Sequence, residues 1–391
     1  MIVGGSAGLA SLIIITSLLS IIRSIKCRRL LETSLIVQII KLILRILKWC
    51  FGIIGKVLKW IFRHIKAFKE NTTNYSLEAL CDIDPERCKK RLEEYQLNPS
   101  IRICSDYMEI ASDPEIDVVS VTSPDYFHAE QSIVLLESGK HVLCEKPMTL
   151  DLDEASAIAD CVRKTGKVFM IAHPTRYTPA FILAKKMIAR GDIGELFMAE
   201  TEYAHNYRHV EGANNWRKDK RRDPMLGGGC HAVDFLRWAV DDLIDEAFAY
   251  GTKKGLADWP IDFDSYFSLY KFKNGVIGKV MCSIGLSRPY TMRSVFYGTK
   301  GTIICDNLSG TLQLSSVPFY DSPEDVTEFI SIPVAVNNHN VESQVQLMSD
   351  IILRGAVNTA DVVEGARTVA ACAAAIESAH TGKPVKVRNE F

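Results

Sequence analysis

Residues 141–147 read HVLCEKP, an apolar run of strand length that ends in two charged residues and a proline. A similar run, VVSVTSPD, covers residues 118–125, and a third, VFMIA, covers residues 168–172. Two helix-like segments separate these runs, one at residues 128–138 and one at residues 151–165. Strands that alternate with helices in this way predict βαβ units and a doubly wound parallel sheet.

The same pattern begins further upstream. Ser76–Cys81 reads as a strand that ends before Asp82, and Pro85–Tyr95 reads as a helix with Asp84 as its cap. Ligands of parallel sheets bind outside the carboxyl ends of the strands. We therefore expect one crevice to collect the side chains at three strand ends, namely Asp82, Ser123-Pro124-Asp125 and Glu145-Lys146.

After His173 the pattern changes, because strand-like stretches follow one another without regular crossover helices. This arrangement predicts a second, α+β domain with a large, mostly antiparallel open sheet. Ala360–His380 reads as a closing helix that Gly382 and Pro384 stop. The predicted strands cover residues 196–203, 265–272, 276–284, 294–297, 301–305 and 311–315.

The first seventy residues differ from the rest in charge and hydropathy. They hold twelve Lys/Arg and two acidic residues, whereas the remainder holds 34 basic and 45 acidic residues. Ile2–Ile22 has no charged residue and approaches the ~20 residues that cross a bilayer. The basic residues that follow, from Arg23 to Arg29, would hold the C-terminal side in the cytoplasm. Between Gln38 and Lys66, polar residues recur at a helical period, as in a basic amphipathic helix on an anionic membrane surface.

We thus predict extra N-terminal hydrophobic helices and membrane contact through residues 1–70. A helix packed on the core and a mistranslated upstream region are the open alternatives. The predicted domains are an N-terminal extension (1–48), a doubly wound α/β domain (49–172) and a C-terminal α+β domain (173–391).

Composition excludes several other classes of protein. The acidic main body is unsuited to binding nucleic acid, which needs a basic surface. The eleven cysteines form no C-x-x-C pair, which indicates a reducing compartment such as the cytoplasm. His205 and His209 lie in a stretch that reads as a strand end or a polar loop on the substrate side, so we predict no metal site.

The CEKP motif at residues 144–147 resembles that of the glucose–fructose oxidoreductase, inositol dehydrogenase and MocA (Gfo/Idh/MocA) family. Further stretches match this family in order, from about residue 64 to the end of the chain. They are CDID at 81–84, VTSPDYFHA at 121–129, RYTP at 176–179, GDIGE at 191–195, WR at 216–217, GGGCHAVD at 227–234, GTKGT at 298–302 and SAHTGKP at 378–384.

The resemblance implies a two-domain oxidoreductase that transfers hydride between NAD(P) and a secondary alcohol or ketone of a sugar, sugar derivative or cyclitol. It makes residues 49–172 a Rossmann NAD(P)-binding domain and residues 173–391 a substrate and oligomerisation domain. It also implies a homo-oligomer, a dimer or tetramer, formed through the C-terminal sheet. Oxidising an alcohol needs a group that takes the hydroxyl proton. The resemblance assigns that role to Lys146 and makes His231 its partner, although Lys146 could be a solvated turn residue and His231 a helix cap.

The resemblance and the strand ends together give the remaining site residues. Asp82 would accept hydrogen bonds from ribose hydroxyls, which favours NAD, but the nearby Arg87 keeps NADP possible. Lys146-Pro147 is a candidate cis peptide bond. The predicted cofactor-binding residues are Gly55, Asp82, Ser123, Pro124, His128, Glu145 and Lys146, and the predicted substrate-binding residues are Arg176, Tyr177, Trp216, Arg217 and Asp234.

Two departures from the family's pattern bear on activity. Phe51–Gly55 looks like the first strand and first glycine of G-x-G-x-x-G, but Val57 and Trp60 stand where the next glycines belong. Gly227 stands where family members commonly carry an Asp, four residues before the histidine. The alternative function is therefore a catalytically impaired relative that acts as a ligand-binding or sensory protein.

Overall fold

The computed structural model describes residues 62–391 apart from residues 72, 211, 318–327 and 338. The predictions for the N-terminal extension and the candidate first strand, with Gly55, lie outside the described residues and stay predictions. Within the described ranges, no helix is both long enough and apolar enough to cross a membrane.

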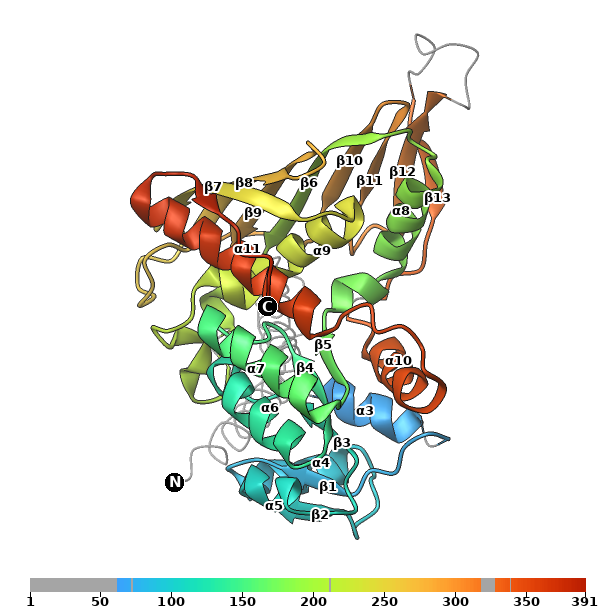
Figure 1. Ribbon diagram of the computed structural model, residues 1–391, viewed down its shortest axis with the longest axis vertical. Coiled ribbons are helices and arrows are strands. Elements are labelled where there is room, and N and C mark those ends of the chain that lie inside the picture. The colour runs from blue at the N-terminus through green and yellow to red at the C-terminus, as the bar shows by residue number, and fades with distance from the viewer. Residues whose placement is uncertain (1–61, 72, 211, 318–327, 338) are drawn as a thin grey trace, which may run out of the picture. The chain divides into compact units, whose positions relative to one another are not determined.

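The parallel strands form two small sheets (Figure 1). β1 (Ala79–Cys81) pairs with β2 (Arg102–Cys104), and β4 (His141–Glu145) lies between β3 (Val118–Val121) and β5 (Phe169–Ala172). All of these pairs are parallel, as the sequence predicts for β3, β4 and β5, whereas no strand is predicted at the position of β2. In the part of the chain that the structure describes, no strand joins β1 to β3, so the predicted single sheet is seen as two pieces.

The helices between these strands begin where the sequence predicts. The carboxylate of Asp84 accepts a hydrogen bond from the Glu86 amide at 3.2 Å, which confirms it as the cap of α4. Asp151 caps α7 in the same way through the amides of Asp153 and Glu154. The helices of this half are α4 (Pro85–Glu94), α5 (Tyr107–Ala111), η1 (Asp125–Phe127), α6 (His128–Glu137) and α7 (Leu152–Thr165).

The second half contains a nine-stranded sheet in the order β13-β12-β11-β10-β6-β9-β8-β7-β14. Only the β6–β9 pair is parallel, which confirms a mostly antiparallel sheet. The sequence prediction missed β7, β13 and β14. The strands are β6 (Leu196–Ala204), β7 (Ile244–Thr252), β8 (Ser265–Phe272), β9 (Ile277–Ser283), β10 (Ser294–Gly298), β11 (Gly301–Cys305), β12 (Thr311–Ser316), β13 (Ile330–Pro333) and β14 (Val385–Lys386).

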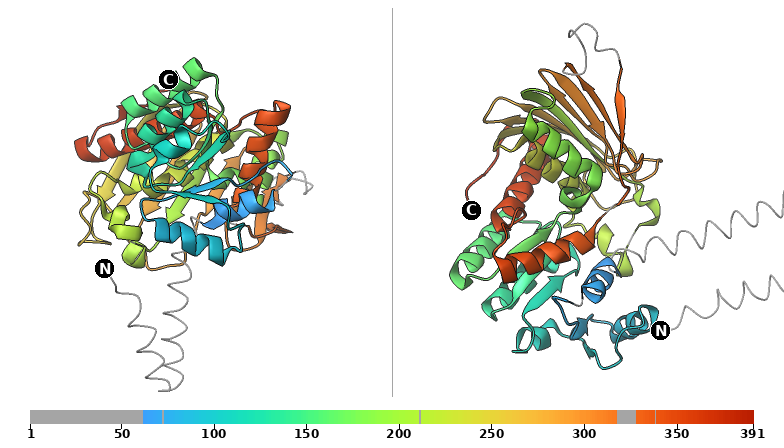
Figure 2. Two further views of the ribbon diagram at one scale, coloured as in Figure 1. Left: turned by 90° about the horizontal axis from the view of Figure 1, so that it is seen from below. Right: turned by 90° about the vertical axis from the view of Figure 1, so that its right-hand side faces the viewer.

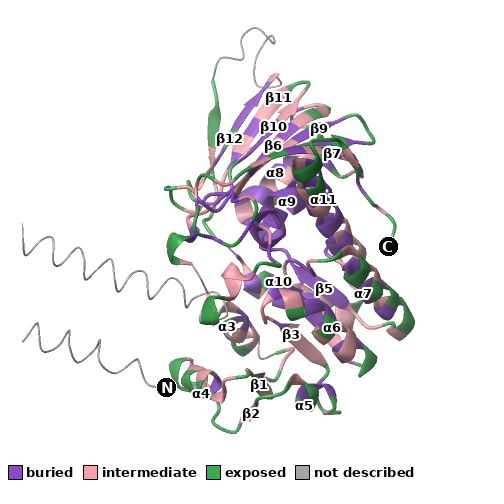
Figure 3. Cartoon of the chain, turned by 90° about the vertical axis from the view of Figure 1, so that its left-hand side faces the viewer, coloured by how far each residue is buried: buried purple, intermediate pink, exposed green. Residues whose placement is uncertain are grey.

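Helices cover one face of this sheet. Of these, α9 (Cys230–Val240) packs on β6, and α11 (Val362–Thr381) packs on β7 and on α7 of the parallel half. Figure 3 shows that α9 and α11 are largely buried. The connecting elements are η2 (Pro174–Tyr177), α8 (Pro179–Arg190), η3 (Tyr207–His209), η4 (Ala213–Lys218) and the π-helical turn η5 (Met225–Gly229).

The chain returns to the parallel strands after the antiparallel sheet. Helix α10 (Val341–Arg354) packs beside α3 (Phe62–Glu70), as Figure 2 shows with α3 in blue and α10 in orange-red. These two helices and strands β4 and β5 share a hydrophobic cluster that includes Ala67, Leu143 and Val345. Residues far apart in sequence therefore enclose the strand that carries the CEKP motif.

Candidate active site

Lys146 lies at the carboxyl end of β4, directly after Glu145. Parallel strands aim their carboxyl ends at one edge of the sheet, which is where ligands of such sheets bind. The Lys146–Pro147 peptide bond is cis, as predicted. The ammonium group of Lys146 donates a hydrogen bond to the carbonyl oxygen of Gly227, with 3.1 Å between Nζ and O. The strand end and the GGGCH segment therefore meet at Lys146.

Gly227 leaves no room for a side chain at the position where the family commonly has Asp. A Cβ atom built there would lie 2.4 Å from a guanidinium nitrogen of Arg222. Arg222 is itself held in place, because its Nε donates to the buried carboxylate of Asp125 at 2.6 Å and its guanidinium lies 4.5 Å from the Trp216 ring. Lys146 thus has a backbone carbonyl as its partner at this position instead of a carboxylate.

The charge of Lys146 lowers the pKa of several histidines, and we call Lys146 and three of these, His205, His231 and His339, the lysine–histidine cluster. His231 lies in the first turn of α9, buried, with its ring stacked on Tyr203 at 5.5 Å. The ring of His339 lies 5.6 Å from that of His231. His205 directly follows β6, as predicted for a strand end, and its Nδ1 lies 3.0 Å from the Tyr203 hydroxyl.

The histidines of this cluster are uncharged at neutral pH. Burial and the charge of Lys146 hold the pKa of His231 well below its usual value. Burial, Arg217 and Lys146 lower the pKa of His205 to about 4. The pKa of His339 is likewise well below its ordinary value because of burial, Arg63 and Lys146. A neutral imidazole can both donate and accept a proton, so the cluster can exchange protons with a bound hydroxyl.

Of the predicted cofactor-binding residues that the structure describes, Asp82, Ser123 and Glu145 lie at or just after the carboxyl ends of parallel strands. Asp82 follows β1, is partly exposed, and accepts a hydrogen bond from the Asp84 amide at 2.9 Å. Ser123, which precedes Pro124 after β3, donates to Gln131 at 2.7 Å. Glu145 is buried, and its Oε1 lies 2.8 Å from Nε2 of His64.

His128 joins the ends of β3 and β4. Its two ring nitrogens lie 2.8 Å from the carbonyl oxygen of Pro147 and 2.9 Å from that of Ser123. Carbonyl oxygens only accept, so both nitrogens must donate, which requires the charged imidazolium. Burial opposes that charge, but Cys144 and the Pro147 carbonyl raise the pKa of His128 to about 9. His128 therefore holds the loop that presents Lys146.

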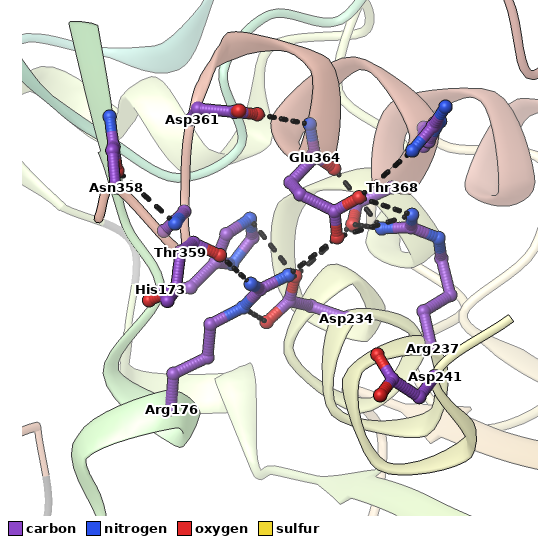
Figure 4. A network of polar contacts seen from close by, with 12 residues as sticks. His173, Arg176, Asp234, Arg237, Asp241, Asn358, Thr359, Asp361, Glu364 and Thr368 are labelled. Atoms are coloured by element: carbon purple, nitrogen blue, oxygen red, sulfur yellow. Dashed lines mark hydrogen bonds and ion pairs between the residues drawn. The ribbon is translucent and has the colours of Figure 1, made fainter. Parts of the chain in front are cut away.

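Two predicted substrate-binding residues, Arg176 and Asp234, are buried and bonded to each other (Figure 4). Arg176 donates two hydrogen bonds to the Asp234 carboxylate, at 2.9 and 2.7 Å. Arg176 and Arg237 both contact Glu364, and Thr368 bridges Arg237 and Asp234. We call Arg176, Asp234, Arg237, Glu364 and Thr368 the carboxylate–arginine network. Its internal pairing favours a structural role over contact with a substrate.

The other predicted substrate-binding residues occupy different surroundings. Tyr177 is buried in the hydrophobic cluster of β4, β5 and α10. Trp216 and Arg217 lie in η4, with the Arg217 guanidinium 4.4 Å from the Trp216 ring. Arg217 lines a recess together with Tyr207, Gly227, Gly228 and Trp259. Among Tyr177, Trp216 and Arg217, it is therefore Arg217 that lies beside Gly227, the residue that Lys146 contacts.

The sequence places His205 at a strand end or in a polar loop on the substrate side, and it gives no role to two further histidines, His64 and His339. His64 comes from α3 and His339 from the turn before α10, each far in sequence from the residues it approaches. The GGGCH and CEKP motifs carry no information about such distant partners.

Comparison with known protein families gives two matches. A family model described as "Oxidoreductase family, NAD-binding Rossmann fold" matches residues 51–173. A second, described as "GFO/IDH/MocA C-terminal domain", matches residues 181–304. Together they cover more than half of the chain, and they agree with the resemblance that the motifs indicate.

Individual relatives are more distant. A levoglucosan dehydrogenase from Pseudarthrobacter phenanthrenivorans is 29% identical over 255 residues, which are 58% of this chain and 64% of the relative. An inositol 2-dehydrogenase/D-chiro-inositol 3-dehydrogenase from Lactiplantibacillus plantarum is 28% identical over 180 residues, 46% of this chain and 49% of the relative. The solved structure of levoglucosan dehydrogenase with NADH and L-sorbose has a TM-score of 0.76 at 22% identity, and the match covers 84% of this chain and 96% of that one. The complex of the same enzyme with NADH and levoglucosan has a TM-score of 0.75. At this identity the likeness concerns the fold.

Proposed function

The chain belongs to the GFO/IDH/MocA family of NAD-binding oxidoreductases, and we propose that it is a dehydrogenase or reductase of a sugar, sugar derivative or cyclitol. One observation carries this proposal. Lys146 ends the central strand of a parallel sheet, donates to the Gly227 carbonyl at 3.1 Å and lies among uncharged histidines. This is the setting that proton exchange with an alcohol requires.

In this proposal the residues of the lysine–histidine cluster move the proton of the reacting hydroxyl. The Gly227 carbonyl orients Nζ of Lys146, whose ammonium group would give a proton to the ketone oxygen in the reducing direction and, as the amine left behind, take it back from the hydroxyl in the oxidising direction. His231, kept neutral by burial and by the nearby ammonium group, would align the hydroxyl by a hydrogen bond and share its proton. Because His231 and Tyr203 are buried, they also exclude water from one side of the site.

The residues at the strand ends fit a dinucleotide cofactor. The partly exposed Asp82 carboxylate suits ribose hydroxyls and would repel a 2′-phosphate, which supports NAD over NADP. Ser123, Pro124 and Glu145 border the same edge, with His128 holding it together. When bound, NAD would supply the acceptor for the hydride that leaves the carbon.

The residues beside Gly227 support a polyhydroxylated substrate. Arg217 offers hydrogen-bond donors there, next to the aromatic rings of Tyr207 and Trp259. The relatives named for levoglucosan, inositol and 1,5-anhydro-D-fructose act on compounds of this kind. We include Trp216 in this site because its ring holds the Arg217 guanidinium at 4.4 Å.

We further propose a homo-oligomer formed through the open face of the nine-stranded sheet. In β8 the side chains alternate between buried and exposed, which leaves Phe267 and Leu269 60% and 56% exposed. Tyr250 on β7, which pairs with Phe267, and Ile277 on β9 are also exposed. Exposed apolar side chains gathered on adjacent strands are typical of a protein–protein interface. Phe267→Lys with Leu269→Lys is expected to shift the chain to monomer in light scattering.

Two measurements test the enzymatic proposal. Energy transfer from tryptophan to NADH during titration should saturate, and a panel of levoglucosan, inositols and aldoses should contain a compound that reduces NAD. Lys146→Ala should lower turnover on the order of 1,000-fold while it leaves the NADH titration unchanged. Absence of a saturable NADH signal would contradict the proposal and favour a ligand-binding protein. Retained turnover in Lys146→Ala would remove Lys146 from the mechanism.

A further inference from the structure

The two residues next to Lys146 in the chain, Glu145 and Pro147, each form a hydrogen bond with a buried histidine. On its C-terminal side, His128 bonds the carbonyl oxygen of Pro147 at 2.8 Å. On its N-terminal side, Nε2 of His64 lies 2.8 Å from Oε1 of Glu145. His64 and Glu145 are 3% and 7% exposed, so solvent does not compete for this contact.

The second oxygen of Glu145 is also engaged. Oε2 accepts a hydrogen bond at 3.2 Å from the backbone amide of Lys146, the residue that carries the reactive amine. Although burial raises the pKa of Glu145, the hydrogen bond from His64 and the charge interactions with His64 and Lys146 outweigh it and lower that pKa. The carboxylate is therefore ionised, and its two oxygens connect His64 to the main chain of Lys146.

His64 is itself held from a third element. Its Nδ1 lies 2.9 Å from Oγ of Ser120 on β3, so the ring is fixed at both nitrogens. A serine hydroxyl can donate or accept, and it can therefore satisfy either protonation state of the imidazole. The chain of contacts runs from Ser120 on β3 through His64 on α3 to Glu145 on β4, and from there to the Lys146 amide.

We propose that His64 is a positioning residue, which fixes the Glu145 carboxylate and thereby the main chain of Lys146, so that the Lys146 amine is held beside the Gly227 carbonyl. This inference rests on the proposed function, because placement matters for turnover only if Lys146 reacts. Small displacements of a reacting group lower a rate strongly, on the order of 100-fold per ångström. Binding of the cofactor's adenosine half, at Asp82, does not depend on this placement.

A matched pair of substitutions separates positioning from packing. His64→Gln keeps a nitrogen donor near the place of Nε2, facing Glu145, whereas His64→Asn keeps one near Nδ1, facing Ser120. Both variants replace the ring by an amide and lose similar packing. Lys66→Ala, at an exposed position on the same helix, serves as the control. Ser120→Ala removes only the far contact of His64.

Two measurements on the full chain test this proposal, the rate of chemical labelling of Lys146 and the steady-state kinetics. The rate at which an amine-reactive ester labels Lys146, measured by peptide mass spectrometry against Lys89, should rise several-fold in His64→Asn and stay near wild type in His64→Gln and Lys66→Ala. With a sugar that the wild type oxidises, kcat of His64→Asn should fall about tenfold or more while KM for NAD stays within about twofold. Ser120→Ala should give a smaller effect in the same direction.

Equal labelling of Lys146 and equal kcat in His64→Asn and the wild type would overturn the proposal. A similar loss in His64→Asn and His64→Gln, with a lower Tm in both, would assign His64 to stability alone and overturn it as well. If the wild type oxidises no sugar, the proposed dehydrogenase function fails, while the labelling series still decides the role of His64.

Discussion

Helix α9 carries two buried polar residues one turn apart, and their surroundings differ in kind. His231 belongs to the lysine–histidine cluster, where the imidazoles are uncharged and Lys146 donates to a backbone carbonyl. Asp234 belongs to the carboxylate–arginine network, where each charged group faces an opposite charge (Figure 4). His231 and Asp234 are equally buried, and the pairing of charge around them distinguishes the two residues.

This difference separates a site that can do chemistry from one that holds the fold together. A fully paired network has no group left for a ligand, and breaking it exposes an uncompensated charge. The neutral imidazoles of the lysine–histidine cluster can each donate and accept a hydrogen bond, so they can engage a bound hydroxyl. We therefore expect substitutions in the network to change stability and those in the cluster to change turnover.

The largest expected effect concerns Asp234. Asp234→Asn leaves Arg176 buried beside a neutral amide, which should lower the free energy of unfolding by about 3–5 kcal/mol. Chemical denaturation measures this loss, and kcat per folded molecule should stay within about twofold of wild type. Asp241→Asn, at the exposed end of the same helix, is the control and should be nearly neutral. A stable Asp234→Asn variant without activity would place Asp234 in the active site instead.

The reverse result is expected for His231. His231→Asn keeps a polar group of similar size but loses proton exchange, so kcat should fall on the order of 100-fold. The unfolding free energy should change much less than in Asp234→Asn. His380→Asn on the surface of α11 is the matched control for turnover. A loss of stability that accounts for the whole loss of activity would contradict a catalytic role for His231.

Acidification should affect the cluster before the network. The pKa of His205, in the cluster, is about 4 in the folded protein, below the ordinary value of 6.5. The unfolded chain binds this proton first, so stability is complete above about pH 6.5 and falls as the pH approaches 4. This histidine should cost about 2 kcal/mol of stability between pH 6.5 and 5. The pKa of Asp234 is lowered instead, so its stabilisation persists until the pH falls below the ordinary carboxylate range.

A Tm profile from neutral to acidic pH checks this order. His205→Gln should flatten the decline between pH 6.5 and 5 relative to the wild type, whereas His380→Gln at the surface should leave it unchanged. Identical slopes in the wild type and His205→Gln would show that His205 does not titrate differently in the two states.

How far the sequence predicts these features depends on how local their causes are. The cap Asp84, strand β4 and the position of Lys146 at its end follow from neighbouring residues, and the structure has them as predicted. The pairing of Arg176 with Asp234 and Glu364 joins three segments that only the folded chain brings together. Sequence motifs therefore identified both residues without distinguishing a structural role from a substrate contact. The same limit hid the contact of His64 with Glu145.

The smallest expected effect tests whether the network behaves as one unit. Thr368 accepts a hydrogen bond from Arg237 at 2.9 Å and donates one to Asp234 at 3.2 Å. Thr368→Val keeps the shape but removes both bonds, so the free energy of unfolding should fall by about 1 kcal/mol and kcat should not change. Thr381→Val, at the exposed end of the same helix, is the control.

Combining Thr368→Val with Asp234→Asn sharpens this test, because residues in one hydrogen-bond network show energies that do not add. The double variant should lose less stability than the sum of the single variants, since part of each loss is the same broken contact. Strict additivity would show that Thr368 and Asp234 act independently. The network would then be a set of separate pairs, and the contrast with the lysine–histidine cluster would rest on the Arg176–Asp234 pair alone.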